Sequence, residues 1–286
     1  MKGRVCAITG ASSGLGYETA LALARQGATV ALLCRSEKRG ARARDQIAAR
    51  TGNEDLHVVH CDHANLDTVR QAAAELLRRF DALHVLVNNA GLMLNQRRIT
   101  VDDLEETFQV NHLSAFLLTD LLLDRLRASA PARVITVSSL AHRAGALDFN
   151  DLQSTRYYDG WTVYANSKLA NVLFTYELAR RLEGSGVTAN TLHPGIVRSG
   201  FGHNNGPLMR ALMTLTQLPP LGASPRRGAR TQVWLAGAPE LEGVTGRYFV
   251  RRRARRSSGG SRNAESQRLL WAASERLLVA PSPTGA

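Results

Sequence analysis

Lysine is nearly absent from this chain of 286 residues. Of its 36 basic residues only Lys2, Lys38 and Lys168 are lysines, and arginine provides every other positive side chain. The two residues differ in chemistry, because guanidinium is a planar, permanently charged fork whereas ammonium is a compact donor that loses its proton more readily. A lysine kept at position 168 therefore indicates a site that requires an ammonium group.

Cysteine is also scarce, and long apolar runs are missing. Cys6, Cys34 and Cys61 lie within or at the ends of predicted strands, and their odd number argues against a disulfide framework. We therefore expect reduced core thiols and a cytoplasmic protein. No run of about 18 apolar residues occurs and residues 1–9 have the pattern of a strand, so we predict a soluble chain without membrane anchor or signal peptide.

Acidic residues are outnumbered, and the formal net charge is +12. Five of the six residues from Arg251 to Arg256 are arginines, a cluster able to bind nucleic-acid phosphates or an acidic membrane surface. Arginine is abundant everywhere in the chain, however, and neither a nucleic-acid-binding module nor an aromatic stacking motif accompanies the cluster. We interpret residues 251–256 as a solvated loop and predict no nucleic-acid partner and no metal site.

The first segment that carries chemistry is a glycine-rich turn. Residues 4–9 have an apolar strand pattern, Gly10-Ala11-Ser12-Ser13-Gly14-Leu15-Gly16 follows, and a helical pattern then runs to Gln26. Free backbone N–H groups and the helix dipole at such a helix start attract a phosphate. Gly10 permits the tight turn, Gly14 a close approach of the pyrophosphate, and Gly16 close helix packing. With a second strand at 28–34, the turn predicts a dinucleotide site.

Strand and helix patterns alternate along the chain. Neither a linker nor an internal repeat divides it, so we predict a single domain over 1–280 and a short tail at 281–286. The alternation is typical of an α/β fold, a doubly wound Rossmann-type parallel sheet with helices on both faces. The predicted strands cover 4–9, 28–34, 56–61, 83–88, 133–138, 187–193 and 246–250, and the predicted helices cover 15–26, 37–50, 65–79, 102–128, 161–184, 225–236 and 262–278.

Tyr164 and Lys168 stand four residues apart, in YANSK, on a predicted helix. Positions i and i+4 share one helical face, so the phenol and the ammonium can meet over one site. A nearby cation favours phenolate and would lower the pKa of Tyr164 from about 10 toward neutrality, where a tyrosine serves as acid or base. Taken alone, the pair is more typical of a solvated helix surface than of a catalytic site.

The chain resembles the short-chain dehydrogenase/reductase family, whose signature combines TGxxxGxG, NNAG and YxxxK. All three are present, at Thr9–Gly16, Asn88–Gly91 and Tyr164–Lys168, and the resemblance runs from Lys2 to about Leu278. It implies an oxidoreductase that interconverts carbonyl and alcohol by hydride transfer with a nicotinamide cofactor. The positions it implies for cofactor binding are Gly10, Ser12, Ser13, Gly14, Leu15, Gly16, Asp62, Asn89, Ala90, Gly91, Tyr164, Lys168, Pro194, Gly195, Val197 and Ser199.

The same resemblance implies a catalytic group. Tyr164 would be the acid/base, Lys168 would tune it and hydrogen-bond the nicotinamide ribose, and Ser139 would hold the substrate oxygen. We prefer Ser139 to Ser138 because neighbours on a strand point to opposite faces. Asn111 would bind a water and extend a proton relay through Lys168, although without these partners it would be read as satisfying backbone groups in a long helix.

The second predicted strand ends without a carboxylate. Cys34-Arg35-Ser36 stands where an acidic residue would bind the ribose hydroxyls of NAD, and Arg35 can pair with the 2′-phosphate of NADP. Lys38 and Arg39 add positive potential. We predict NADP(H) and give NAD(H) second place; a solvent-facing Arg35 is the alternative.

Segments outside the motifs bear on substrate and assembly. Residues 140–142, 147–152, 157–158, 167–171 and 244–249 resemble the retinol dehydrogenase-like branch, whose members handle retinoids and other lipophilic alcohols or carbonyls. The resemblance implies a lipophilic substrate, with a substrate lid at about 200–222. Family counterparts of the helices at 102–128 and 161–184 commonly pair in homodimers or homotetramers. The side chains that offer apolar surface there, although some of it must face the protein's own sheet, are Leu117, Leu121, Leu122, Val172, Phe174 and Leu178.

Two other functional classes stay open. One is a regulatory or scaffold protein that binds NADP(H) without turnover, although intact Ser139, Tyr164 and Lys168 argue against it. The other is an epimerase or dehydratase of the related group that shares YxxxK. The TGxxGxxG turn and the larger C-terminal substrate domain of that group are absent from this sequence.

Overall fold

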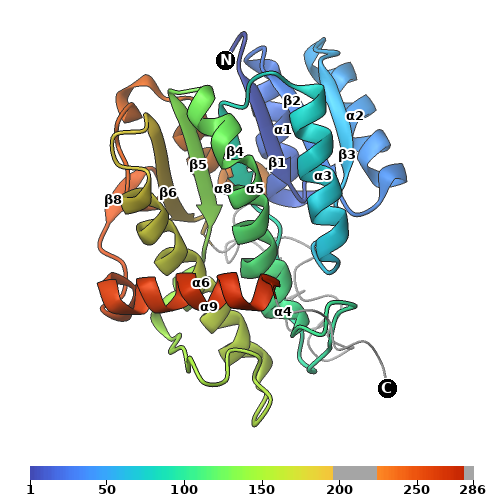
Figure 1. Ribbon diagram of the computed structural model, residues 1–286. Helices are drawn as coiled ribbons and strands as arrows, with labels where there is room; N and C mark the ends of the chain where they lie inside the picture. The colour runs from blue at the N-terminus through green and yellow to red at the C-terminus, as the bar shows by residue number, and fades with distance from the viewer. Residues whose placement is uncertain (196–223, 280–286) are drawn as a thin grey trace.

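The structure, a computed structural model, describes residues 1–195 and 224–279. One eight-stranded sheet runs through them in the order β3-β2-β1-β4-β5-β6-β7-β8 (Figure 1). Strands β1 to β7 pair in parallel, and β8 pairs antiparallel with β7. The strands are β1 (Val5–Thr9), β2 (Thr29–Cys34), β3 (Leu56–His60), β4 (Val85–Asn88), β5 (Ala132–Val137), β6 (Val187–His193), β7 (Tyr248–Val250) and β8 (Arg253–Arg255). The predicted doubly wound α/β fold is confirmed.

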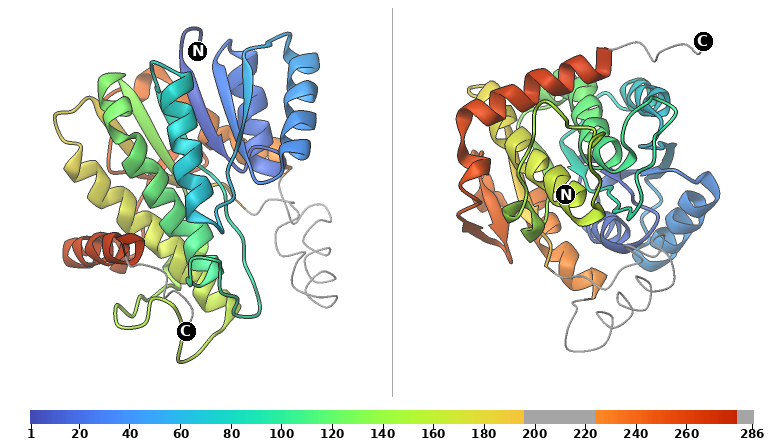
Figure 2. Two further views of the ribbon diagram at one scale, coloured as in Figure 1. Left: turned by 45° about the vertical axis from the view of Figure 1, so that its right-hand side comes forward. Right: turned by 90° about the horizontal axis from the view of Figure 1, so that it is seen from below.

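Helices cover both faces of the sheet (Figure 2). On one face lie α1 (Gly14–Arg25), α2 (Glu37–Thr51) and α8 (Pro225–Gly237); on the other lie α3 (Leu66–Arg79), α5 (Ser114–Ala128) and α6 (Gly160–Arg181). Alternate strand residues feed two separate cores, so Ile8 packs with the first set and Ala7 with the second. This is what a parallel sheet buried on both faces requires. None of the described helices is long and apolar enough to cross a bilayer.

The single helix expected over 102–128 is wrong at its N-terminal end. Residues 102–105 form a turn and an isolated bridge, α4 covers only Glu106–Phe108, and a π-helical turn at Gln109–Leu113 leads into α5. The Asp102 carboxylate instead accepts hydrogen bonds from the Leu66 N–H (2.9 Å) and the Gln109 side chain (2.7 Å). Tertiary contacts of this kind override a helical apolar pattern, which cannot distinguish an α from a π turn.

The last helix, α9 (Ala264–Val279), lies across α6 and α5. Its Trp271 ring packs 4.7 Å from that of Phe116 and 5.8 Å from that of Phe174, measured between centroids. Of the six side chains expected between subunits, only Leu121 is exposed. The other five are buried within the chain itself: Leu117, Leu122, Val172, Phe174 and Leu178. The expectation that these five provide intersubunit surface is wrong, because α9 and the protein's own core already occupy them.

The arginine cluster is only partly the loop that we expected. Arg251 and Arg252 have φ values of 50° and 61° and form the two-residue turn of a hairpin, after which Arg253 pairs with Val250. All six residues from 251 to 256 are exposed. Within the described chain none of these arginines forms an ion pair. A short, charged edge strand blocks pairing with a further strand.

The three cysteines are free and buried, as expected. Burial disfavours the thiolate, raising the pKa of Cys6 and Cys61 to about 12 and that of Cys34 to about 11. All three are therefore inert core thiols at neutral pH.

Candidate active site

The loop between β1 and α1 has the geometry of a phosphate cradle. Gly10 and Gly14 adopt φ values of +65° and +58°, which favour glycine. A Cβ on Gly16 would lie 2.4 Å from the Gly10 carbonyl oxygen, so only glycine fits there. No atom lies within 4 Å of a Cβ built on Gly14, so the backbone is open at this point. Ser13 begins the helix in an extended conformation, and its hydroxyl caps no backbone N–H.

Hydrogen bonds hold the loop after β4 against this cradle. The Thr9 hydroxyl accepts the N–H groups of Asn89 (2.8 Å) and Ala90 (2.9 Å), and the Asn89 amide donates to the Thr9 carbonyl (2.8 Å). Gln232 of α8 donates to the Asn89 side-chain oxygen at 3.3 Å. The sequence argument used Thr9 only as part of a motif and missed Gln232, which lies 143 positions from Asn89 along the chain.

Asp62 follows β3 and is half-buried. One of its carboxylate oxygens accepts the Ala64 N–H at 3.1 Å. The adjoining His63 is buried and hydrogen-bonds the Ser114 hydroxyl through Nδ1 at 2.9 Å. Burial lowers the pKa of His63 to about 4, so it packs there as a neutral ring. The Asp62 turn is therefore held by a satisfied core histidine.

Ser139, Tyr164 and Lys168 meet where β5 ends and α6 begins. Ser139 begins the turn after β5; its side chain interacts with Tyr164, and its hydroxyl accepts the Ala141 N–H at 3.2 Å. Lys168 Nζ lies 5.7 Å from the centroid of the Tyr164 ring and donates to the Val137 carbonyl at 3.4 Å. Ser138 points away and donates to the Lys168 carbonyl at 2.7 Å. Of the two neighbouring serines, Ser139 is therefore the one whose side chain lies beside Tyr164.

The predicted lowering of the Tyr164 pKa is wrong for this structure. Burial raises the pKa of Tyr164 to about 12, and the hydrogen bond with Ser139 opposes this only in part. The Lys168 ammonium is itself buried, and the loss of solvation lowers its pKa to about 8. The loss of solvation of the phenolate thus raises the pKa of Tyr164 more than the nearby Lys168 ammonium lowers it.

Asn111 lies in the π-helical turn and connects two parts of the site. Its side-chain oxygen accepts the Leu92 N–H at 2.7 Å, and its amide donates to the Leu92 carbonyl (2.9 Å) and the Ser167 hydroxyl (2.8 Å). A Cβ on Gly91 would lie 3.0 Å from Lys168 Nζ and 3.1 Å from the Asn111 side-chain oxygen. Asn111, Gly91 and Lys168 are therefore neighbours. Sequence reasoning missed Ser167, which no motif marks as distinct from other helical serines.

The chain after β6 supports the site from its other side. His193 accepts the Leu140 N–H through Nδ1 at 3.2 Å, and burial lowers its pKa to about 4, so it is a neutral structural residue. Pro194 and Gly195 follow, with a φ of +93° at Gly195. Val197 and Ser199 lie outside the described residues, as do the predicted lid at 200–222 and the tail at 281–286.

Two arginines lie near the end of β2. Arg35 is exposed and makes no hydrogen bond or ion pair with any described residue. Arg39, in the first turn of α2, reaches the phosphate cradle, where it donates to the Ser13 hydroxyl at 3.4 Å. From the sequence Arg39 could be assigned only a general contribution to the positive potential, because the direction of its side chain depends on how α2 packs.

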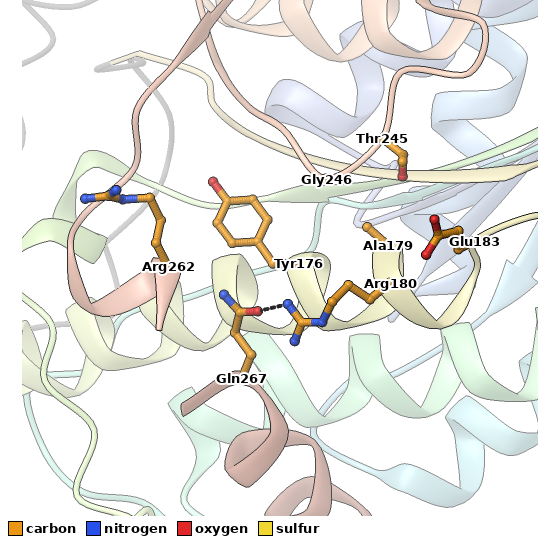
Figure 3. Close-up of a pocket in the computed structure, with 8 residues that line it drawn as sticks. All are labelled: Tyr176, Ala179, Arg180, Glu183, Thr245, Gly246, Arg262 and Gln267. Atoms are coloured by element: carbon orange, nitrogen blue, oxygen red, sulfur yellow. Dashed lines mark hydrogen bonds between the residues drawn. The ribbon is translucent and has the colours of Figure 1, made fainter. Parts of the chain in front are cut away.

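A surface pocket of about 380 Å³ lies elsewhere, between the C-terminal half of α6, the residues just before β7 and the segment from Arg262 to Gln267 (Figure 3). It is lined by Tyr176, Ala179, Arg180, Glu183, Thr245, Gly246, Arg262 and Gln267. Tyr176 comes eight residues after Lys168, about 12 Å along the helix axis. Its hydroxyl donates to Ser257 at 2.8 Å, and Gln267 accepts a hydrogen bond from Arg180. This pocket is therefore separate from the Ser139–Tyr164 pair.

Known proteins of similar sequence and structure share this arrangement of elements. The family described as short chain dehydrogenase matches residues 4–207. Human retinol dehydrogenase 13 is 42% identical over 287 residues, covering 99% of this chain and 86% of that protein. Mouse retinol dehydrogenase 12 is 43% identical, covering 96% of this chain and 86% of that protein.

Two solved structures extend the likeness to three dimensions. The crystal structure of an uncharacterised protein from Mycobacterium paratuberculosis has a TM-score of 0.77 at 34% identity, covering 99% of this chain and 96% of that one. A short chain dehydrogenase from Escherichia coli CFT073, complexed with NADPH, has a TM-score of 0.70 at 26% identity, covering 88% of this chain and 98% of that one.

Proposed function

The chain belongs to the short chain dehydrogenase family and is an oxidoreductase, and from this premise we propose that it uses NADP(H) to interconvert a carbonyl and an alcohol on a lipophilic small molecule. One observation carries the proposal. Ser139, Tyr164 and Lys168 meet beside the glycine loop, where the Ser139 side chain interacts with Tyr164 and Lys168 Nζ lies 5.7 Å from the phenol ring centroid. Reduction of a carbonyl needs such a proton donor beside a polar group that holds the substrate oxygen.

Each member of this group has a distinct role in the proposal. Ser139 holds the substrate oxygen, and Tyr164 donates its proton to that oxygen as negative charge develops there. A pKa of about 12 keeps Tyr164 protonated at neutral pH, which suits the donor role in reduction. Lys168 carries the ammonium that stabilises the tyrosinate left behind, and Asn111 positions Leu92 and, through Ser167, the first turns of α6. A nicotinamide cofactor supplies the hydride when bound.

The residues of the cradle fit a dinucleotide. A pyrophosphate can approach the backbone at the start of α1. Gly10 and Gly14 have left-handed backbone conformations there, and Gly16 stands where no side chain fits. Gly91 leaves room beside Lys168 Nζ that any larger residue would fill. The remaining positions assigned to this cofactor are Ser12, Ser13, Leu15, Asp62, Asn89, Ala90, Pro194, Gly195, Val197 and Ser199.

The preference for NADP(H) rests on Arg39 and Arg35. Arg39 lies within hydrogen-bonding distance of Ser13 in the cradle, and Arg35, at the end of β2, has no partner among the described residues. Cys34, the last residue of that strand, is buried, and no carboxylate stands there to bind ribose hydroxyls. Guanidinium groups pair well with phosphate, and the E. coli structure similar to this one is complexed with NADPH.

The double variant Arg35→Gln/Arg39→Gln is expected to have a lower kcat/KM for NADPH. The decrease should be about one to two decades for each guanidinium that pairs with the 2′-phosphate. The reason is that such a charge-assisted pair stabilises the bound cofactor by on the order of 1.5–3 kcal/mol. The kcat/KM for NADH should hardly change, because NADH has no 2′-phosphate. Arg42→Gln, an exposed change on the same helix, serves as the matched control. Both cofactors are measured at one ionic strength, because salt screens the effect; equal decreases for NADPH and NADH would refute the assignment.

A carbonyl panel monitored by NADPH absorbance tests the proposed reaction itself. The panel runs from small ketones to polycyclic ketones and retinal, because the similar human and mouse proteins are named retinol dehydrogenases. We expect oxidation of NADPH with lipophilic carbonyls and a higher kcat/KM for them than for small ketones. Binding of NADPH without turnover of any carbonyl would favour the regulatory alternative instead.

A homodimer or homotetramer and a cytoplasmic location complete the proposal. The location rests on three buried free thiols, which suit a reducing compartment. Because five of the six side chains expected at the interface are buried within the chain, an assembly would have to use other surface, such as that around the exposed Leu121. Light scattering at micromolar concentration is expected to give a multiple of the 31.1 kDa chain mass; a monomer would contradict this prediction.

A further inference from the structure

Trp161 differs from the other two tryptophans of the chain in that its indole is largely open to solvent. It is 55% exposed, whereas Trp271 is buried and Trp234 is half-buried. Trp271 and Trp234 each donate their indole N–H to a glutamate at 2.7 Å. The Trp161 N–H has no hydrogen-bond partner among residues 1–195 and 224–279. An aromatic body and a polar N–H are therefore both left available for contact with a ligand.

Trp161 lies one helical turn before Tyr164, on the same side of α6. The two ring centroids are 6.1 Å apart, with 42° between the ring planes. The start of α6 is rigidly held, since the Asp159 carboxylate accepts the Thr162 N–H at 2.8 Å. A Cβ on Gly160 would lie 2.2 Å from the Leu94 carbonyl oxygen, so this turn packs directly on the segment after β4. The indole is thus placed beside the proton donor by a fixed element.

A second exposed apolar side chain, that of Leu140, lies next to Ser139. Leu140 directly follows Ser139 and is 45% exposed, although its own N–H is anchored on His193 at 3.2 Å. Ser139 and Tyr164 each therefore have a large apolar neighbour that faces solvent. A substrate oxygen held between them would bring its nearest substituents to these side chains, and water would be excluded from that contact.

Building on the proposed function, we propose that Trp161 is a specificity-determining residue that stacks on the flat, conjugated or aromatic part of a carbonyl substrate. Stacking on indole adds to the area buried and discriminates in favour of planar ligands. Leu140 packs against the same substrate near its carbonyl carbon. The substrate class is a planar lipophilic carbonyl, such as an aryl ketone or aldehyde, in preference to a small saturated ketone.

Kinetics with two probes test this inference on the full chain. Relative to the wild type, Trp161→Ala is expected to lower kcat/KM for 9-fluorenone, a planar ketone, by roughly 10- to 100-fold, mainly through KM. Trp161→Phe should stay within about threefold, because phenyl also stacks. Cyclohexanone, too small and non-planar to stack, should change by less than about threefold in both variants. Leu269→Ala, an exposed apolar residue on α9, is the control and should affect neither probe.

Fluorescence separates this inference from the reaction on which it builds. With NADP⁺ present, 9-fluorenone should quench part of the tryptophan emission of the wild type, and that part should be missing in Trp161→Phe. Quenching without turnover would refute the proposed reaction but leave the Trp161 contact standing. Quenching that persists in Trp161→Phe, no binding by the wild type, or equal kinetic losses for both probes in Trp161→Ala would overturn it.

Discussion

Replacing Tyr164 with phenylalanine is expected to lower kcat for carbonyl reduction by about 10²- to 10⁴-fold, the usual contribution of a positioned general acid. The change removes one oxygen from a half-buried ring and leaves the shape of the site intact. The dissociation constant for NADPH should therefore change by less than about threefold, since the rest of the cradle is untouched. Stopped-flow or steady-state NADPH oxidation gives kcat, and fluorescence titration gives the dissociation constant.

Tyr157→Phe is the matched control, because it removes the same hydroxyl from an exposed ring that lies outside the Ser139–Tyr164 pair. It should retain wild-type turnover. A Tyr164→Phe variant that reduces carbonyls at near wild-type rates would remove Tyr164 from the acid role and leave Ser139 without its proposed function.

Lys168→Arg is expected to lower kcat/KM by at least about tenfold and to change its dependence on pH. Burial lowers the pKa of Lys168 to about 8, so in the wild type the ammonium is lost as pH rises through that value. Wild-type reduction should fall across this range, while Tyr164, with a pKa of about 12, stays protonated. Arginine keeps its charge throughout, so the weakened variant should show no fall near pH 8.

The measurement is kcat/KM between pH 6 and 10 at constant ionic strength, for both enzymes and one ketone. The guanidinium must also fit where a Cβ on Gly91 would already be 3.0 Å from the lysine nitrogen, which explains why the rate should fall. If both enzymes lose activity near pH 8, the titrating group is not Lys168.

Predicting this fold from sequence worked where the deciding interactions are local. Each predicted strand had its apolar run and each crossover its amphipathic helix, so a parallel sheet was predicted, and β1 to β7 do pair in parallel. The failures lie where a distant residue intervenes or where a tight turn was not recognised. The Asp102 carboxylate bonds Leu66 across 36 positions and ends the pattern expected of one long helix, and Arg253 pairs with Val250 only because a two-residue turn places it there.

In the active site, too, the features that depend on local spacing were predicted and those that depend on packing were not. Spacing in the sequence predicted that Tyr164 and Lys168 share a face and that the glycines form a cradle, and strand alternation predicted that Ser138 and Ser139 point to opposite faces. The sequence did not predict the direction in which the pKa of Tyr164 is shifted. The pKa of Tyr164 rises because the phenol is desolvated, and desolvation depends on everything packed around it.

The amino-acid sequence by itself determined which chemical groups this protein possesses and which near neighbours they meet. Helical and strand periodicity depend only on backbone geometry, so Tyr164 meets Lys168 whatever surrounds them. The tertiary structure alone decided that Arg39 reaches Ser13, that Trp161 stays exposed beside Tyr164, and that α9 covers Phe116 and Phe174. These contacts join residues far apart in the chain or depend on what is left uncovered, and both follow from close packing of the whole domain.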